Sequence, residues 1–461
     1  MRLLTTTLAS TLAAASEKGN VDKGKFKMIV GLGETGYSVA KYLHSTGVDF
    51  EVADSDAAPS CLPELQALVP DIELHTLESS LLMSAEEIIL SPGVPQSIPV
   101  LREARAKGIK VTGDIAMFGD LAEAPIVAIT GSNGKSTVTS LVGMLASSQL
   151  NGVKVAGNIG TPCLDVLEAG ALLYILEVSS FQLEVAMELP LKVAALLNLS
   201  SDHMDRYLNV EDYYGVKGNI FNRCECAVVP RRGIVSFNIP TDAVFTFGRD
   251  APANDMQFGL VGTKEDPVLS HGSRELIRAA DLPLKSRHDI QNALAALAIG
   301  YASDLEMGAM IEDLQKFRGL AHRCEWVGDF AGVSFINDSK ATNIGASISA
   351  IEGFSKGKNI VLILGGEGKG ADFELMIPTI KNCVKKVLVF GRDGKAIRAV
   401  LHGAASVELV DNLDEIVDVA ISSAGCGDTV LFSPACASFD MFESYSARGN
   451  EFKRLLMEKL S

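Results

Sequence analysis

The sequence predicts an α/β protein built from three domains. Glycine-rich turns follow apolar strands at two places in the first third of the chain, and apolar runs alternate with helical patterns along the rest. A chain of 461 residues is too long for one hydrophobic core, and 47% hydrophobic residues with 42 glycines suit layers of helices and parallel strands. We therefore expect several α/β domains.

The first domain begins with an apolar strand that runs into the turn Gly31-Leu-Gly-Glu-Thr-Gly36. A second strand ends at the carboxylate of Asp54, so a G-x-G-x-x-G turn is followed by an acid about 20 residues later, as in dinucleotide-binding folds. We predict an N-terminal Rossmann-like domain over residues 26–112 that binds a nucleotide or nucleotide sugar, with NAD as the default ligand. A glycine turn without a ligand is the alternative.

The second domain, residues 113–320, contains the most informative segment of the chain. The strand beginning at Ile126 leads into Gly131-Ser-Asn-Gly-Lys-Ser-Thr137, where backbone N–H groups, a lysine and two hydroxyls meet at the start of a helix. This pattern predicts an ATP phosphate site in a P-loop ATPase-type domain, although Ile129 stands where the first glycine of the usual motif belongs. An ordinary glycine turn is the alternative. Further strands are expected at 172–178, 193–199, 226–229 and 244–247.

The third domain, residues 321–461, repeats the alternation of strands and helices. Strands are expected at 359–364, 386–390, 406–410 and 429–432, which again indicates a parallel sheet and a C-terminal Rossmann-like α/β domain. Because open parallel sheets bind ligands at the carboxyl ends of their strands, we expect the functional site there and at the junctions of the domains.

Several polar clusters follow the predicted strands. Glu177 could hold a magnesium ion or lie in solvent, and His203, between two aspartates, could be a ligand or a capped turn residue. Lys217 on a predicted helix has the pattern of a solvated surface lysine. The segment 287–297 could cap a helix or bind a ligand, and the crowded segment 335–343 favours an anion-recognition loop over a plain solvated loop.

The composition excludes several classes of protein. A net charge of −16 argues against nucleic acid binding. The 8 cysteines lack metal-ligand spacing, which favours reduced thiols in a cytoplasmic enzyme. Residues 1–25 form an extension whose apolar run is broken by threonines, so we expect a disordered or loosely helical segment and not a signal peptide. No uninterrupted apolar run reaches the length of a membrane span.

In combination the motifs resemble one family, the ATP-dependent muramyl ligases, over residues 26–461. The resemblance rests on Gly131–Thr137, Leu176-Glu-Val-Ser-Ser-Phe-Gln-Leu-Glu184, Asp202-His-Met-Asp-Arg206 and His288–Asn292. Further motifs narrow it to the member that joins D-glutamate to UDP-N-acetylmuramoyl-L-alanine in peptidoglycan synthesis; they are Asn337-Asp-Ser-Lys-Ala-Thr-Asn343, Ser433-Pro-Ala-Cys-Ala-Ser-Phe-Asp440 and Arg448-Gly-Asn-Glu-Phe452.

The resemblance implies that ATP phosphorylates the sugar–alanine carboxylate and that the amine of D-glutamate attacks the acyl phosphate. Lys135 would then contact the transferred phosphate, and Ser136 and Glu177 would hold one Mg²⁺. His203 and Lys217, carbamylated by CO₂, would hold a second Mg²⁺. The implied ATP-binding residues are Gly131, Ser132, Asn133, Gly134, Lys135, Ser136, Thr137, Asn292, Arg323 and, near the ribose, Asp338.

The same resemblance assigns the other two substrates. The residues implied for UDP are Gly33, Glu34, Thr35, Gly36 and Asn158 near the diphosphate, Asp54 and Ser55 near the uracil, and Ser91, Pro92 and Gly93 in the same cleft. The residues implied for D-glutamate are Lys340, Thr342, Lys369, Ser438 and Tyr445, because lysine and hydroxyl donors suit a dianionic amino acid. The G-x-G-x-x-G turn would then serve UDP instead of NAD. We expect a cytoplasmic monomer.

Three positions depart from the family pattern. Glu34 replaces a residue that is more often apolar, Asp289 replaces an asparagine beside the adenine site, and Tyr445 replaces an aromatic residue without a hydroxyl. Two other hypotheses remain open: a related ligase that lengthens folate with glutamate, and a regulatory protein that senses ATP and NAD without turnover. Gly31–Gly36 with Asp54 and the Asn337–Asn343 loop argue against the folate ligase. The sensing hypothesis gives no reason for Lys340, Thr342 and Ser438.

Overall fold

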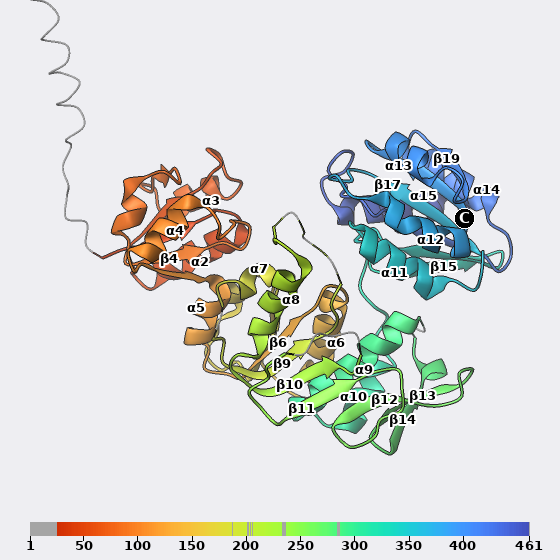
Figure 1. Cartoon of the computed structure of the whole chain (residues 1–461), viewed down its shortest axis with the longest axis horizontal. Helices are drawn as coiled ribbons and strands as arrows, with labels where there is room; N and C mark the ends of the chain where they lie inside the picture. The colour runs from red at the N-terminus through yellow and green to blue at the C-terminus, as the bar shows by residue number, and fades with distance from the viewer. Residues whose placement is uncertain are drawn as a thin grey trace, which may run out of the picture. The chain divides into compact units, whose positions relative to one another are not determined.

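The computed structural model describes residues 25–460 except 187, 201, 203, 205, 233–236 and 284–285 (Figure 1). The expected extension, residues 1–25, lies outside the described residues except for residue 25. The predicted site residue His203 also lies outside them. By internal contacts the chain forms two compact units. One contains the described residues up to 123 with 156–169 and 179–189, and the other contains 124–155, 170–178 and the remainder. Among the described residues, no helix is both long and apolar enough to cross a membrane.

The first sheet has five parallel strands in the order β3-β2-β1-β4-β5. Its strands are β1 (Lys27–Val30), β2 (Phe50–Ala53), β3 (Leu74–His75), β4 (Glu87–Leu90) and β5 (Lys110–Gly113). Its helices are α2 (Glu34–Ser45), α3 (Leu62–Leu68), α4 (Pro99–Ala106), α5 (Asp114–Leu121) and the short η1 (Ser80–Ser84). The strand order reverses between β1 and β4, which is the switch point where such sheets bind ligands.

The second sheet has nine strands in the order β14-β13-β12-β11-β10-β9-β6-β8-β7. Its strands are β6 (Ile126–Thr130), β7 (Val153–Gly157), β8 (Leu173–Glu177), β9 (Leu191–Leu196), β10 (Cys224–Pro230), β11 (Val244–Phe247), β12 (Gln257–Gly262), β13 (Pro267–His271) and β14 (Arg274–Arg278). Its helices are α6 (Lys135–Ser147), η2 (Cys163–Val166), α7 (Ser180–Leu183), α8 (Val210–Gly218), η3 (Asn219–Phe221), η4 (Ala279–Asp281), α9 (Arg287–Ala302) and α10 (Met307–Leu314).

The sequence analysis missed part of this second sheet. The strands β12, β13 and β14 form antiparallel pairs that extend one edge. Their strands mix apolar and charged side chains over short stretches, as in 274–278, and such edge strands carry a weak hydrophobic signal. The helices α6, α9 and α10 pack with the parallel strands in one core, whose members include Val127, Leu141, Leu294 and Met310.

The third sheet has six strands in the order β15-β16-β20-β17-β18-β19, of which only the β15–β16 pair is antiparallel. Its strands are β15 (Glu325–Phe330), β16 (Val333–Asn337), β17 (Ile360–Gly365), β18 (Val384–Phe390), β19 (Ser406–Leu409) and β20 (Thr429–Phe432). Its helices are α11 (Ile344–Phe354), η5 (Phe373–Met376), α12 (Ile377–Cys383), α13 (Gly394–Leu401), α14 (Leu413–Ser423) and α15 (Tyr445–Leu460).

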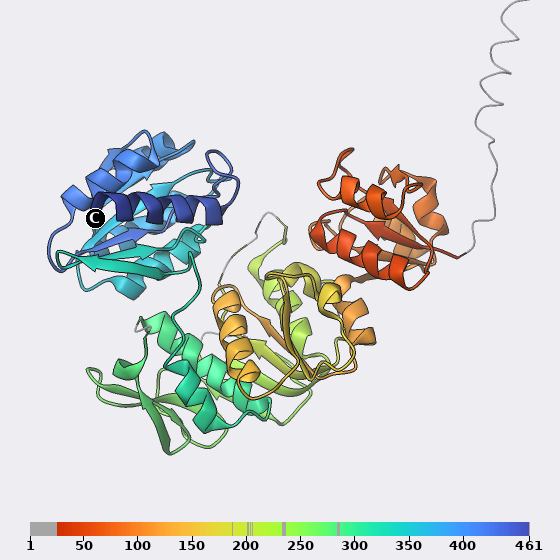
Figure 2. The same cartoon turned by 180° about the vertical axis from the view of Figure 1, so that it is seen from behind.

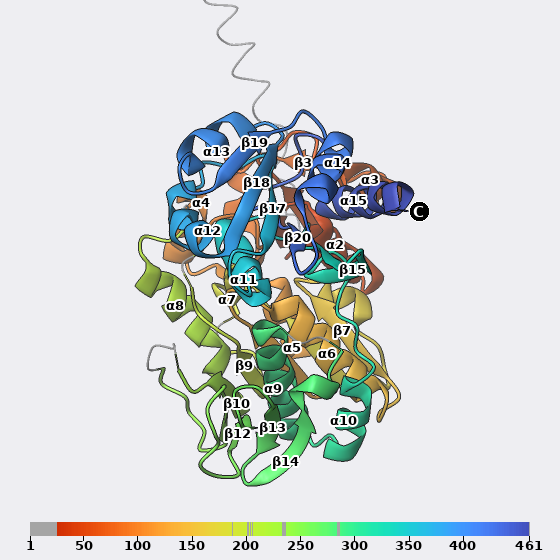
Figure 3. The ribbon, with the colours of Figure 1, turned by 90° about the vertical axis from the view of Figure 1, so that its right-hand side faces the viewer.

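Helices cover both faces of the third sheet. One buried cluster joins the strands to α11, α12 and α13, and a second joins them to α14 and α15. Figure 2 shows the C-terminal helix α15 lying across one face, and Figure 3 shows α12 and α13 on the opposite side of the strands from α14 and α15. All three sheets combine mainly parallel strands with flanking helices, so the predicted α/β class is confirmed.

Candidate active site

The segment that leads from β6 into the first turn of α6, residues 131–137, is shaped to approach an anion closely; we call it the phosphate loop. Gly134 caps α6 in the left-handed conformation with φ 81°, and a Cβ there would lie 2.9 Å from Oδ1 of Asn292. The first N–H groups of α6 have no partner within the helix and face the same side as the positive end of its dipole. Lys135 Nζ folds back onto the carbonyl oxygens of Gly131 at 3.0 Å and Ser132 at 3.2 Å.

The segment that follows β9 braces the phosphate loop. Asn198 accepts from the N–H of Asn133 at 2.8 Å through Oδ1 and donates through Nδ2 to the Asn133 carbonyl at 2.9 Å. Ser132 Oγ accepts from the N–H of Ser200 at 3.0 Å and lies 3.1 Å from the hydroxyl of Tyr213. These bonds fix the loop before any ligand binds. The sequence analysis gave no role to Asn198 or Tyr213.

Two oxygen-bearing side chains are buried beside the phosphate loop. Glu177 ends β8, with its backbone paired to Ile129 of β6, and is 2% exposed. Ser136 is 1% exposed, and its hydroxyl accepts a 2.5 Å hydrogen bond from Nη2 of Arg323. Burial lowers the pKa of Lys135, and the charge of Arg323 lowers it further, while Glu177 acts in the opposite direction. Lys135, Ser136, Glu177 and Arg323 therefore form one charged cluster around the loop.

Lys217 is buried against the same loop from α8. Its side chain is 1% exposed, and Nζ donates to the Gly131 carbonyl at 3.0 Å and to Thr130 Oγ1 at 3.4 Å. Nζ also lies 4.8 Å from the ring centroid of Tyr213. Burial lowers the pKa of Lys217 well below its ordinary value, and the charge of Lys135 lowers it further. The surface position that its helix pattern suggested is therefore wrong.

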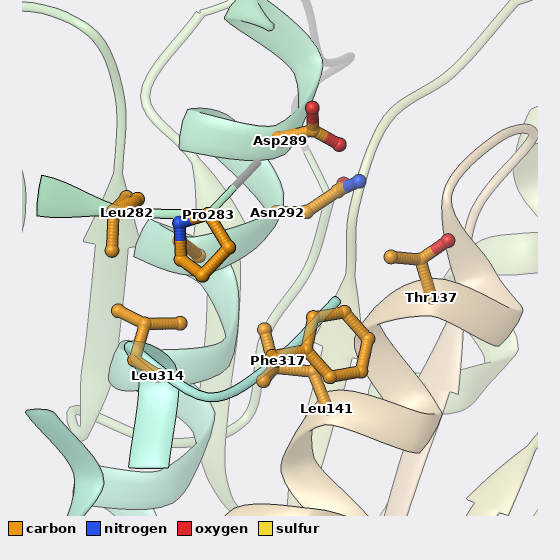
Figure 4. Close-up of a pocket in the computed structure, with 9 residues that line it drawn as sticks. Thr137, Leu141, Leu282, Pro283, Asp289, Asn292, Leu314 and Phe317 are labelled. Atoms are coloured by element: carbon orange, nitrogen blue, oxygen red, sulfur yellow. The ribbon is translucent and has the colours of Figure 1, made fainter. Parts of the chain in front are cut away.

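A pocket opens beside the phosphate loop between α6, α9 and α10 (Figure 4). In that view Asp289 and Asn292 project from α9 toward the helix that carries Thr137 and Leu141. The remaining walls are apolar and consist of Leu282, Pro283, Ala293, Leu314 and Phe317. Such a combination of apolar walls with a few polar groups suits a flat heterocycle.

Asp289 has a structural role at the start of α9. Its Oδ2 accepts from the N–H of Ser286 at 3.1 Å and from the Ser286 hydroxyl at 2.6 Å, which completes a capping box. Burial raises the pKa of Asp289 above its ordinary value. The predicted capping of this helix is thus present, and the same residue lines the pocket.

The loop after β16 holds several of the predicted residues together. Asp338 accepts from Ser433 Oγ at 2.7 Å and from the Cys324 N–H at 3.1 Å, and burial raises its pKa to about 6. Lys340 Nζ donates to the Tyr445 hydroxyl at 3.2 Å. Lys369 Nζ lies 5.5 Å from the ring centroid of Phe439, next to the buried Ser438. Thr342 is exposed.

A fully buried arginine connects the loops around these residues, and the sequence analysis quoted it only as part of a motif. Arg448 is 0% exposed and donates to the carbonyls of Ser339 at 2.7 Å, Cys436 at 3.1 Å and Ala437 at 3.2 Å. It also donates to Ser339 Oγ at 3.0 Å and to the Gly365 carbonyl at 3.4 Å. Burial lowers the pKa of Arg448 to about 10, which still leaves it cationic at neutral pH. Its position in a charged helical segment gave no sign of this burial.

In the other compact unit, the glycine turn lies at the switch point of the first sheet. A Cβ on Gly36 would lie 2.0 Å from the Gly31 carbonyl, so only glycine fits. Asp54 Oδ2 accepts from the N–H of Leu32 at 2.6 Å, and Ser91 Oγ donates to the Gly31 carbonyl at 2.6 Å. Gly33, Glu34, Ser55, Gly93 and Asn158 are exposed, and Thr35 and Pro92 are half-buried. Asp54 and Ser91 thus fix the turn, while its tip remains open to a ligand.

The described residues contain no group of three or more His, Cys, Asp or Glu side chains placed to hold a metal ion. The predicted ligand His203 lies outside the described residues. Ser136 and Glu177, by contrast, are buried hard oxygen donors at the phosphate loop, and magnesium commonly binds one or two such groups and keeps several waters. Their chemistry fits Mg²⁺.

Comparison with protein-family models gives three consecutive matches. Residues 25–113 match the "Mur ligase MurD-like, N-terminal domain", residues 129–300 the "Mur ligase middle domain", and residues 322–436 the "Mur ligase, glutamate ligase domain". The expected three-domain α/β fold is therefore confirmed.

Curated relatives match nearly the whole chain. A protein of Marinobacter nauticus, named UDP-N-acetylmuramoylalanine–D-glutamate ligase, is 43% identical over 437 residues, which cover 93% of this chain and 97% of the relative. A protein of Pseudomonas aeruginosa with the same name is 44% identical over 441 residues, covering 94% and 98%.

Solved structures share the fold at lower identity. The UDP-N-acetylmuramate–alanine ligase MurC of Thermotoga maritima has a TM-score of 0.55 at 19% identity and covers 95% of this chain and 99% of its own. The MurF ligase of the same organism, solved with ADP, has a TM-score of 0.54 at 16% identity and covers 95% of both chains.

Proposed function

The chain belongs to the Mur ligase family, and we infer from this that it joins D-glutamate to UDP-N-acetylmuramoyl-L-alanine in an ATP-dependent step of peptidoglycan synthesis. The observation that carries the inference is the match over nearly the full length to relatives named for this reaction, at 43% and 44% identity. The residue clusters at the phosphate loop and in the third sheet supply the chemistry that the reaction needs.

The reaction proceeds in two transfers because a carboxylate is a poor acyl donor. A carboxylate oxygen of the sugar–alanine attacks the γ-phosphorus of ATP, ADP leaves, and an acyl phosphate forms. The amine of D-glutamate then attacks the acyl carbon, the C–O bond to phosphate breaks, and the amine loses a proton as the amide forms. Catalysis of this kind depends on positioning and on neutralising charge, not on a protein nucleophile.

The phosphate loop binds the triphosphate. The N–H groups at the start of α6 contact the phosphate oxygens, together with Gly131, Ser132, Asn133, Gly134 and Thr137. Lys135 leaves the carbonyls that it contacts in the absence of ligand and follows the transferred phosphate. Asn292 and Arg323 complete the nucleotide site, Asp338 lies near the ribose, and the pocket of Figure 4 holds the adenine.

Ser136 and Glu177 would hold one Mg²⁺, and His203 and Lys217 would contribute to a second. When bound, these ions neutralise phosphate charge as it shifts toward ADP. Lys217 first needs a change of charge, because an ammonium repels a metal whereas a carbamate is an anionic oxygen ligand. Its burial and lowered pKa favour the neutral amine that attacks CO₂, forming a C–N bond and releasing one proton.

The first sheet binds the UDP moiety at its switch point. The open tip of the glycine turn, Gly33–Gly36, and Asn158 contact the diphosphate, with the backbone N–H of Glu34 as its donor. Asp54 and Ser55 lie near the uracil, and Ser91, Pro92 and Gly93 line the same cleft. The bond from Leu32 to Asp54 supports this role, because it places the carboxylate at the turn.

The third sheet binds D-glutamate through Lys340, Thr342, Lys369, Ser438 and Tyr445. Two lysines and three hydroxyls match an acceptor with two carboxylates, and the bonds of Arg448 hold their loops together. We further propose that the enzyme is a cytoplasmic monomer that serves cell-wall growth, cell shape and cell division.

The test is phosphate release by the purified protein with Mg·ATP and UDP-N-acetylmuramoyl-L-alanine, in the presence of D-glutamate, L-glutamate or neither. We expect turnover only with D-glutamate and a large loss in Lys340→Ala. If the folded protein binds ATP but shows no turnover with any of these acceptors, the proposed reaction is contradicted. Saturable NAD binding would then favour a sensing role.

A further inference from the structure

A large cavity that the proposed reaction does not use lies at one edge of the second sheet. Its volume is about 860 Å³, and its walls come from the carboxyl ends of β10, β11 and β12, from the loops that follow them and from the start of α9. These three strands are neighbours and run parallel. Parallel pairing through β9 also joins β10 to β6, the strand that leads into the phosphate loop. The cavity therefore lies at the edge of the sheet where parallel strands place ligands, but beside other strands than the phosphate loop.

Four cationic side chains line this cavity against a single carboxylate. The cations are Arg232, Arg249, Lys264 and Arg287, and the carboxylate is that of Asp250. The chain as a whole has 57 acidic and 41 basic residues, so this local excess of positive charge runs against its composition. Among the residues that the structure describes, Arg249, Lys264 and Arg287 are exposed and form no ion pair with a carboxylate. The cavity thus presents cations whose charge is not balanced by neighbouring side chains.

The one lining carboxylate already has a partner outside the lining. Arg231 donates to the carboxylate of Asp250 through Nε at 3.2 Å and Nη2 at 3.1 Å, and Nη2 also donates to the Asp250 carbonyl at 2.8 Å. Nη1 of Arg231 donates to the Phe258 carbonyl at 2.6 Å. A Cβ on Gly259 would collide with the Asp250 carbonyl, so the loop from β11 to β12 packs closely on β12. These bonds fix one wall before any ligand binds, which lowers the entropy cost of binding.

Apolar side chains form much of the remaining wall. Phe247 and Ile290 are buried, and Pro230, Leu260 and Pro267 lie beside the cationic residues. A volume of about 860 Å³ is typical of sites for small molecules and not of surfaces that bind macromolecules. Apolar walls combined with several cations match a small ligand that carries more than one negative charge. Phosphate groups suit these donors, because guanidinium and ammonium groups form charge-assisted hydrogen bonds with phosphate oxygens.

We propose that this cavity is a second anion site, separate from the phosphate loop, that binds a small ligand carrying two or more phosphate groups. Arg249, Lys264 and Arg287 contact the phosphate oxygens, and the apolar walls contact the rest of the ligand. The proposal does not depend on the reaction proposed above, because it concerns binding alone.

The test is calorimetric titration of the full chain with inorganic tripolyphosphate, at low ionic strength and without magnesium. The cavity variant carries Arg249→Met and Lys264→Met, which are exposed positions outside the bonds of Arg231. The control variant carries Arg274→Met and Lys358→Met, which remove the same charge from exposed positions that do not line the cavity. Thermal unfolding checks that both variants are folded.

We expect two binding events in the wild-type chain, one at the phosphate loop and one at the cavity. The cavity variant should raise the Kd of one event on the order of tenfold, because it loses charge-assisted hydrogen bonds that solvent partly screens. The control variant should keep both events. A cavity variant that binds like the wild-type chain, or an equal loss in both variants, would overturn the proposal.

A second titration with GDP distinguishes two sources of the phosphate groups. GDP that binds the cavity more tightly than tripolyphosphate would assign the apolar walls to the base of a nucleotide, whereas tighter binding of tripolyphosphate would assign the site to a free oligophosphate. Both results support the site if the cavity variant weakens them. A wild-type chain without D-glutamate-dependent turnover would contradict the proposed function and leave this test unaffected.

Discussion

Three lysines of the candidate site each lie against an aromatic ring. Lys217 is 4.8 Å from the centroid of Tyr213, Lys340 is 4.9 Å from that of Tyr445, and Lys369 is 5.5 Å from that of Phe439. An aromatic face attracts a cation without adding a negative charge, whereas a carboxylate paired with the lysine would compete with an anionic substrate. The rings of Tyr445 and Phe439 thus hold Lys340 and Lys369 in position without neutralising the charge that anionic substrate groups need, whereas Lys217 is proposed to act as a carbamate.

The role proposed for Lys217 leads to a prediction at this single residue. Lys217→Ala removes the group that becomes the carbamate, so phosphate release should fall by about 100-fold or more, in the range seen for lost metal support. Formate or acetate should restore part of the activity, because a short carboxylate can occupy the space of the carbamate. Full activity of the Ala variant without added carboxylate would rule out the assignment.

At the scale of single residues, the sequence predicted the position of the phosphate loop better than it predicted the burial and contacts of Lys217 and Arg448. Lys135 and Ser136 follow directly on an apolar strand and a glycine turn, so their place is a local property. The burial of Lys217 depends on α8 packing against Gly131, which is far away along the chain. Arg448 likewise bonds to carbonyls of three distant loops, and only folding brings them together.

At the scale of elements, the start of α6 depends on a glycine. Gly134→Ala places a side chain in the left-handed region and a Cβ 2.9 Å from Asn292 Oδ1, so both the loop and Asn292 must shift. We expect the Kd for Mg·ATP to rise about 10- to 100-fold in calorimetry, equivalent to the roughly 1–3 kcal/mol of such strain. Gly425→Ala, whose Cβ would meet only Asp428 Oδ2 at 3.8 Å, is the control and should bind like the wild-type chain.

The attachment of α15 to the third sheet depends on Arg448. Arg448→Met removes the donors to four buried carbonyls, and leaving such groups unpaired should cost about 3 kcal/mol or more of local stability. Hydrogen exchange should then speed up in β16, β17 and β20. Arg454→Met on the same helix removes only exposed ion pairs with Glu451 and Glu458 and should leave these rates almost unchanged. Equal exchange rates in both variants would contradict this role of Arg448.

Several parallel strands were predictable because their signal is local. Fully buried strands such as β6 and β17 are continuous apolar runs, and turns at their ends mark their limits. The antiparallel edge β12–β14 was missed because its strands mix charged and apolar residues and are stabilised by pairing with one another.

At the scale of the whole molecule, the proposed substrate sites are divided between the two compact units. All residues proposed for UDP lie in one unit, and those proposed for ATP and D-glutamate lie in the other. Because one reaction joins these substrates, we propose that substrate binding is accompanied by domain closure. Small-angle scattering should show one chain per particle and a smaller radius of gyration when a non-hydrolysable ATP analogue and UDP-N-acetylmuramoyl-L-alanine are both bound. An unchanged radius would argue against closure.

The pocket of Figure 4 has a consequence for selective inhibition. All of its lining residues belong to one compact unit, so a compound bound there does not have to follow any movement between units. Asp289 presents a carboxyl group to the pocket, and a carboxylate accepts hydrogen bonds but, when ionised, donates none. We therefore expect an inhibitor with a cationic donor facing position 289 to bind this enzyme more tightly than its Asp289→Asn variant.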